Sequence, residues 1–196
     1  MWPWEHAAVG YLVYSLSVRR LTGAPPSDRA AWALLFGTLV PDLVDKTLSW
    51  GLGLFPTGYA VGHSIFVAVP VGVLVLQRAR GRSRALSCWA FVTGYWSHLV
   101  GDVLSPLRAG DPVAVERLLW PVVVGGPYEE SYGLERGLVY LGDFVAGFGS
   151  MGPAGLALTL VLPALTVALG VADGLPGVGP LVRASGAARR RLRRRL

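Results

Sequence analysis

The chain has 196 residues, of which 53% are hydrophobic and only 15% are charged, and its mean hydropathy is +0.49. Soluble domains carry about a quarter charged residues, so this composition argues against a soluble protein and predicts an integral membrane protein with one compact domain. The net charge of +6 comes from arginines between apolar runs, which indicates membrane topology rather than nucleic-acid binding. The single cysteine, Cys88, excludes an intrachain disulfide.

Five apolar segments approach the length of about 20 helical residues that a membrane crossing requires. In chain order they cover about 6–20, 31–51, 60–77, 85–105 and 151–172. We therefore predict an all-α, polytopic transmembrane helix bundle of about five spans, forming a single domain over residues 1–182. The outer-side loop between the fourth and fifth segments is predicted to contain a helix over 134–149, which either lies on the surface or re-enters the membrane.

The basic residues predict an orientation for this bundle. Most of them fall in the connections 19–30 and 78–84 and in the tail 183–196. With five spans these three segments lie on one side, which the positive-inside rule makes cytoplasmic. We therefore predict a multi-pass protein of the cell membrane with its N-terminus outside and a basic cytoplasmic tail at its C-terminus.

Ionisable side chains interrupt the predicted spans. Such groups are costly in a bilayer, and they usually face a cavity or a partner. At a rise of about 1.5 Å per residue, six of them fall in one band about 10 Å thick in the outer half of the bundle. They are His6, Asp42, Asp45, His63, His98 and Asp102. The predicted topology did not use these residues, so their common depth predicts one cluster built from four helices.

The fourth segment shows which helix face turns toward this cluster. Spacings of three and four residues place Gly94, His98 and Asp102 on one side of a helix. Small residues let helices approach closely in lipid, so this face is predicted to point into the bundle. Tyr95 and Trp96 are then predicted to face lipid.

Imidazole and carboxylate ligands without thiolate suit divalent ions such as Zn²⁺ and Mn²⁺. Six candidate ligands are enough for one or two ions. A bound ion polarises a phosphoryl or carbonyl oxygen and lowers the pKa of water toward about 7, so the cluster predicts hydrolysis. Asp45 and His98 are the catalytic candidates, with Asp45 able to act as a base instead of a ligand. A proton or ion relay and a purely structural cluster are the alternatives.

The order of these motifs resembles that of the membrane-bound metal-dependent hydrolases, a family that includes LexA-regulated and inner-membrane members. The resemblance covers about residues 1–122. It rests on His6, "GTLVPDLVD" (37–45), "GHSIF" (62–66) and "GYWSHLVGDVLS" (94–105). It implies a hydrolase without naming a substrate. Many relatives have a basic residue or histidine before the HS pair, where this chain has Gly58 or Tyr59, which removes one ligand or substrate contact.

The depth of the cluster favours a phosphoester or lipid-linked substrate drawn from membrane lipid, or a small molecule. Lys46 lies near the predicted outer mouth, where it can hold a phosphate. No phosphate-binding glycine loop and no nucleic-acid motif occurs. The competing hypothesis is a metal or proton transporter that uses the same cluster. The absence of a matching polar set in the inner half of the spans argues against it.

Overall fold

The computed structural model describes residues 2–108, 110–130 and 132–179, and these form helices and turns without a strand. The α-helices are α1 (Pro3–Thr22), α2 (Asp28–Lys46), α3 (Ile65–Gln77), α4 (Arg82–Arg108), α5 (Arg136–Ser150) and α6 (Pro153–Ala172). Shorter turns are the π-helix η1 (Thr47–Gly51) and the 3-10 helices η2 (Pro112–Leu118) and η3 (Gly133–Glu135). The predicted all-α class is confirmed. The predicted basic tail lies outside the described residues.

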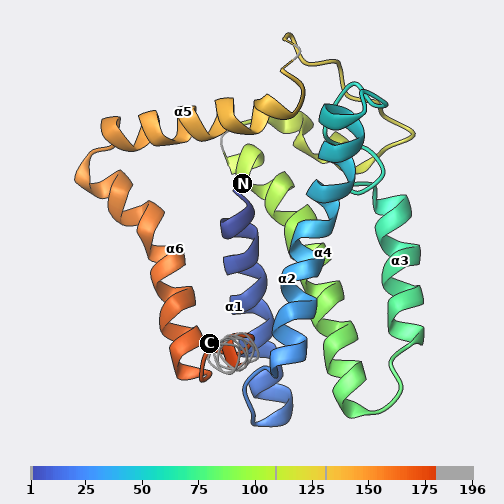
Figure 1. The fold of residues 1–196 in the computed structure, drawn as a ribbon, viewed down its shortest axis with the longest axis vertical. Coiled ribbons are helices and arrows are strands. Elements are labelled where there is room, and N and C mark those ends of the chain that lie inside the picture. The colour runs from blue at the N-terminus through green and yellow to red at the C-terminus, as the bar shows by residue number, and fades with distance from the viewer. Residues whose placement is uncertain (1, 109, 131, 180–196) are drawn as a thin grey trace, which may run out of the picture.

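Local capping sets the ends of the first two helices. Pro3 occupies the first turn of α1, where its missing N–H costs nothing, and Gly23 ends that helix with φ 71°. Ser27 caps α2 by accepting a hydrogen bond from the backbone N–H of Ala30 at 3.3 Å. The short connection between the two caps makes α1 and α2 antiparallel neighbours (Figure 1).

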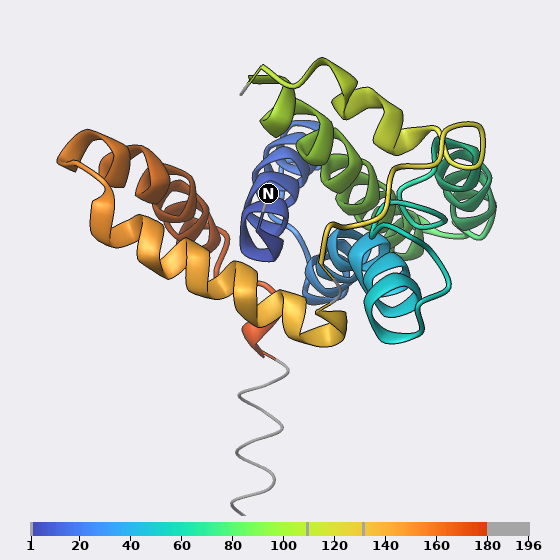
Figure 2. The same ribbon diagram turned by 90° about the horizontal axis from the view of Figure 1, so that it is seen from above.

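Three helices, α1, α2 and α4, pack against one another in the centre of the molecule (Figures 1 and 2). α2 and α4 approach closely because each presents a glycine to the backbone of the other. A Cβ atom on Gly37 would lie 2.2 Å from the carbonyl oxygen of Phe91, and one on Gly94 would lie 2.4 Å from that of Leu34. The predicted close-packing role of Gly94 is therefore confirmed.

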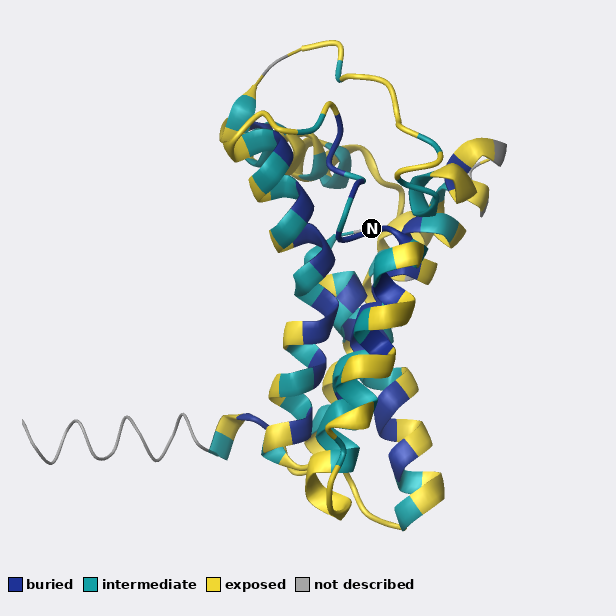
Figure 3. Cartoon of the chain, turned by 90° about the vertical axis from the view of Figure 1, so that its right-hand side faces the viewer, coloured by how far each residue is buried: buried dark blue, intermediate teal, exposed yellow. Residues whose placement is uncertain are grey.

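The buried sides of the helices face one another (Figure 3). Many large apolar side chains are exposed on the outside. One apolar cluster joins α1, α2 and α4 through Tyr14, Val18, Ala30, Leu34 and Ala90, and a second joins α3 and α4 through Ala68, Tyr95 and Leu99. Outward-facing residues such as Phe36 and Leu43 are more than half exposed. An exterior this apolar suits contact with lipid.

α5 runs across the end of the molecule at which the chain begins, and α6 returns along one side (Figures 1 and 2). The predicted helix over 134–149 is thus present as α5. The predicted basic connections 19–30 and 78–84 both lie at the opposite end (Figure 1). α6 meets the central helices at its last turn, where Asp173 binds side chains of α1.

The prediction of about five membrane spans is wrong. Among the described helices, only α6 is long and apolar enough to cross a membrane by length and composition. α3 has 13 residues, because the chain from 60 to 64 forms a turn instead of extending the helix. α2 and α4 are long enough, but they carry charged side chains at their ends and the polar residues of the cluster, which lower their hydropathy.

Candidate metal centre

Four of the predicted ligands meet at one point. Asp42 is on α2, His63 is in the turn before α3, and His98 and Asp102 are one turn apart on α4. One ligand atom from each lies within 4.8 Å of all the others, and all four side chains are buried. Three of the four residues lie on α2 and α4, so the close approach of these two helices brings them together.

The distances between these atoms match the spacing of metal ligands. Ligand atoms about 2.0–2.1 Å from a tetrahedral Zn²⁺ lie about 3.3 Å from one another. The Nε2 atoms of His63 and His98 are 3.1 Å apart, and they lie 3.2 and 3.4 Å from Asp102 Oδ2. The same two nitrogens lie 3.6 and 3.7 Å from Asp42 Oδ1. Five of the six separations are thus within about 0.4 Å of that spacing, and all four atoms lie within 4.8 Å of one another, as around a single ion.

The tautomer of each imidazole is set by an acceptor oxygen that faces its Nδ1 atom. His98 Nδ1 lies 2.7 Å from the carbonyl oxygen of Thr38, which can only accept, so this nitrogen carries the proton. His63 Nδ1 lies 2.8 Å from Asp45 Oδ2 and donates in the same way. When both rings are neutral, their Nε2 atoms then present lone pairs to each other at 3.1 Å. Two facing lone pairs repel unless a cation or a proton lies between them, which is the arrangement that a metal ion resolves.

Asp45 lies beside this group rather than in it. Its carboxylate accepts backbone N–H bonds from Ala60 at 2.7 Å, Gly62 at 2.7 Å and His63 at 3.0 Å, in addition to the His63 ring. Asp45 is fully buried. The predicted roles as metal ligand and catalytic base both need a carboxylate oxygen that faces the reacting centre. Here both oxygens are already engaged, and Asp45 fixes the turn that carries His63.

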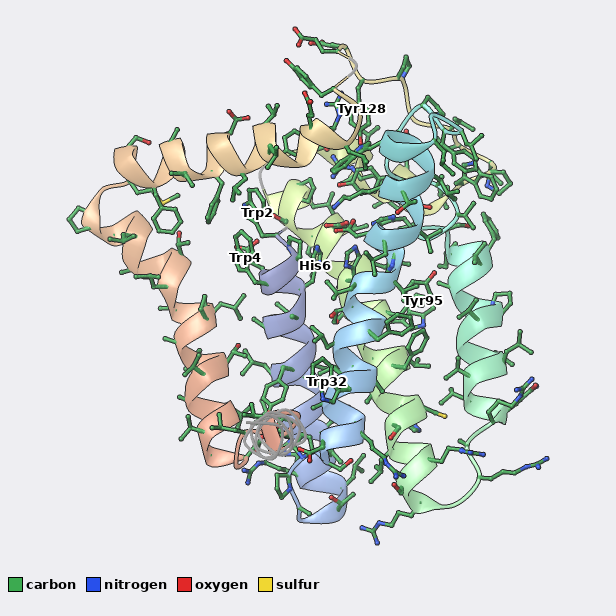
Figure 4. The ribbon with its side chains drawn as sticks, in the orientation of Figure 1. Trp2, Trp4, His6, Trp32, Tyr95 and Tyr128 are labelled. Atoms are coloured by element: carbon green, nitrogen blue, oxygen red, sulfur yellow. The ribbon has the colours of Figure 1, made fainter. Side chains whose placement is uncertain are left out.

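His6 also lies at the edge of the group. Its ring stacks on that of His98 with centroids 3.8 Å apart, and its Nε2 lies 3.1 Å from Asp102 Oδ1. The other oxygen of Asp102 belongs to the four-atom group, so His6 borders that group. Both ring nitrogens of His6 are buried, and neither makes a hydrogen bond among the described residues. Figure 4 shows His6 on the side of α1 that faces α2.

Sequence reasoning missed the groups that aim the ligands. The Thr38 carbonyl and the amides of Ala60 and Gly62 are backbone atoms, so no residue type signals them. Tyr95 was predicted to face lipid, and this was wrong. Its ring is 2% exposed and its hydroxyl donates to the Gly62 carbonyl at 2.7 Å, which holds the same turn from the other side. Gly58, at the position of the relatives' basic residue, donates its N–H to the Tyr128 hydroxyl at 3.0 Å.

The fold and the cluster together define an all-helical protein with a buried His/Asp site that can hold a metal ion. The family model described as YdjM inner membrane protein matches residues 1–175, and the chain belongs to this family. The match supports the predicted membrane location and covers every residue of the cluster. No curated protein and no solved structure matches the chain.

Proposed function

We propose that this protein is a membrane-embedded metal-dependent hydrolase whose ion is held by Asp42, His63, His98 and Asp102. The observation that carries the proposal is the pair of Nε2 lone pairs, fixed by acceptors behind each ring, beside two carboxylates at ligand spacing. Zn²⁺ and Mn²⁺ are the ions that this donor set favours. A purely structural cluster would instead keep one ring protonated, so that its Nε2–H faces the other ring and Asp102.

A bound divalent ion supplies Lewis acidity and lowers the pKa of the water that it holds. The chain supplies the geometry: Asp45 and the Thr38 carbonyl fix the rings, and His6 lies against Asp102. Four protein donors leave room for water only in five- or six-fold coordination, which Mn²⁺ accepts readily and Zn²⁺ reaches by expansion. Both oxygens of Asp45 already accept hydrogen bonds, so in this proposal Asp45 is not a ligand. His98 is a ligand, and the four donors hold one ion.

The position of the cluster supports a substrate at the membrane surface, and the arginines of the connections support an orientation of the protein in the membrane. The cluster lies nearer the end covered by α5 than the end with the basic connections (Figures 1 and 4). Because arginines favour the cytoplasmic side, we assign the α5 end and the N-terminus to the outside. A phosphoester, in a lipid headgroup or a lipid-linked molecule, is the substrate class that such a position favours.

Metal analysis of the purified protein tests the site. The wild-type chain is expected to contain close to one Zn²⁺ or Mn²⁺ per molecule, and His98→Ala and Asp102→Ala to lose most of it. Asp143→Ala, an exposed carboxylate on α5, is the matched control and should keep the metal. A wild-type protein without metal, or equal metal in all four proteins, would overturn the site.

Hydrolysis of bis(p-nitrophenyl) phosphate tests the reaction. We expect turnover by the metal-loaded wild type and a loss of about 100-fold or more in the Asp102→Ala variant, since removing an ion removes several kcal/mol of charge stabilisation. Bound metal without turnover, together with metal uptake into vesicles, would instead establish the transporter.

A further inference from the structure

A cavity of about 680 Å³, here called the side cavity, borders the metal centre at Asp42. Its walls come from the start of α1, from α2 with η1, from α4 and from α5 with its preceding turn. Asp42 is part of its lining, so the cavity ends at one of the four donor residues. By contrast, the larger cavity of about 800 Å³ between α1 and α4 is lined by none of the four. The side cavity is therefore a route by which a substrate can reach the ion.

The inner end of the side cavity is polar and carries a cation. Asp42 uses Oδ1 in the donor group, and its Oδ2 pairs with Lys46, one helical turn later. The side chain of Lys46 is 32% exposed and its ammonium lies 5.4 Å from the centre of the Trp50 ring. An ammonium beside a metal ligand suits the binding of an anionic group that also contacts the ion.

Apolar residues make up much of the rest of the side cavity, beside the polar residues Glu5, Thr47, Ser105 and Tyr140. Leu39, Leu43, Trp50 and Leu134 contribute to its walls. Leu43 is 56% exposed and Leu134 is 69% exposed, so apolar side chains continue from the cavity onto the outer surface. A water-soluble ligand gains no binding free energy from these apolar side chains, whereas an alkyl chain remains in apolar surroundings as it enters.

We infer that the substrate is an amphiphile with one anionic phosphoryl head and an apolar chain, which enters from the lipid through the side cavity. The inference rests on the proposed function for the identity of the site and the phosphoester class, and it adds the apolar chain and the route of entry. The head contacts Lys46 and the ion beside Asp42, and the chain lies along Leu39, Leu43 and Trp50. The cavity volume is within the range of about 300–1,000 Å³ of ligand pockets.

Gly137 allows the cavity to be filled without removing a contact. It lies on α5 and lines the cavity, and a Cβ there would meet only the Trp50 ring, at 3.9 Å. Leucine is a better helix former than glycine, so Gly137→Leu occupies the cavity and retains the helix. Gly142→Leu is the matched control, because it makes the same change on the same helix where nothing lies within 4 Å.

The experiment measures binding of dodecylphosphonate and ethylphosphonate, which cannot be hydrolysed, to the full-length protein in lipid nanodiscs, with empty nanodiscs as the blank. Wild type and Gly142→Leu should bind the long chain at least about tenfold more tightly than the short one. Gly137→Leu should lose that preference, and Lys46→Gln should weaken both ligands by on the order of tenfold. Metal content of each variant checks that the site remains intact.

Two results would overturn the inference: equal binding of the two phosphonates by the wild type, or a full chain-length preference in Gly137→Leu. The binding is measured with and without metal, so the outcome is separate from that of the hydrolase assay. A chain-length preference in a protein without phosphoesterase activity would refute the proposed reaction and support the side cavity. Turnover of bis(p-nitrophenyl) phosphate without any chain-length preference would support the proposed reaction and refute the role of the side cavity.

Discussion

At the scale of single residues, each of the four ligands of the candidate metal centre contacts a second group, and for Asp42 this group is the Lys46 ammonium. Asp45 holds His63, the Thr38 carbonyl holds His98, and His6 contacts Asp102. These supports fix which nitrogen is protonated, and they remove the rotational freedom that ligation would otherwise cost. The ligands are therefore arranged for an ion before it binds.

Asp45→Asn tests this support. The amide keeps the size of the side chain and one acceptor oxygen, but it loses the charge and presents an N–H to donors. Supporting residues of this kind typically contribute about 10–100-fold to metal affinity, and we expect a loss of that size with all four ligands present. Competition with a zinc chelator measures it. An unchanged affinity would contradict the assignment of Asp45 as the group that orients His63.

At the scale of helices, the metal centre depends on how closely α2 approaches α4. Gly37 and Gly94 occupy the crossing, and each would place a Cβ within 2.5 Å of a backbone oxygen of the other helix. The turn before α3 is an equally specific feature. Its amides at Ala60, Gly62 and His63 bind the Asp45 carboxylate, which ties this turn to α2.

Gly94→Ala tests the crossing of α2 and α4. The added methyl group would push the helices apart, because it meets backbone rather than a flexible side chain. We expect a loss of stability of about 1–3 kcal/mol, with reduced metal content because Asp42 moves away from His98. Thermal unfolding in detergent and metal analysis measure the two effects.

Gly72→Ala on α3 is the matched control for that substitution. A Cβ at Gly72 would meet the Trp96 ring at 3.7 Å, an ordinary contact. This variant should unfold near the wild-type temperature and keep its metal. Equal behaviour of the two variants would show that the close crossing does not position the ligands.

At the scale of the whole molecule, α6 is joined to the central helices by a buried carboxylate. Asp173 accepts hydrogen bonds from Tyr11 and Ser15, both at 2.6 Å, and from Arg19 Nε at 2.6 Å. Burial raises the pKa of Asp173, but the bonds from Ser15, Tyr11 and Arg19 outweigh burial and hold the pKa below its ordinary value of 3.8. This contact fixes the end of α6, which among the described helices is the one that qualifies as a span by length and composition.

The stability of this junction is expected to depend on acid. A carboxylate whose pKa is lowered in the folded state stabilises it fully above the unfolded value of 3.8, and this contribution is lost as the pH falls below that value. Asp173→Asn should therefore lower the stability by about 1–3 kcal/mol at pH 7. The difference from wild type should shrink below about pH 4. Thermal unfolding of both proteins between pH 7 and pH 3 measures it, and a constant difference would contradict the role of the charge.

The sequence by itself determined the helical class, the approximate position of each helix and the shared depth of six ionisable residues. It could do so because hydrophobic runs and helical rise depend on local composition alone. The predicted number of spans was wrong. α2 and α4 are long enough to cross a bilayer, but their charged residues lower their hydropathy below that of a membrane span.

Only the tertiary structure decided which residues form the four-atom group and which support it. His6 and Asp45 have the same side-chain chemistry as the ligands, so residue type cannot separate them. Their roles follow from contacts across distant parts of the chain: the Thr38 carbonyl behind His98, and the amides of residues 60–63 around Asp45. Ring orientation is set by such backbone atoms, and their positions exist only once α2, α4 and the turn before α3 are packed together.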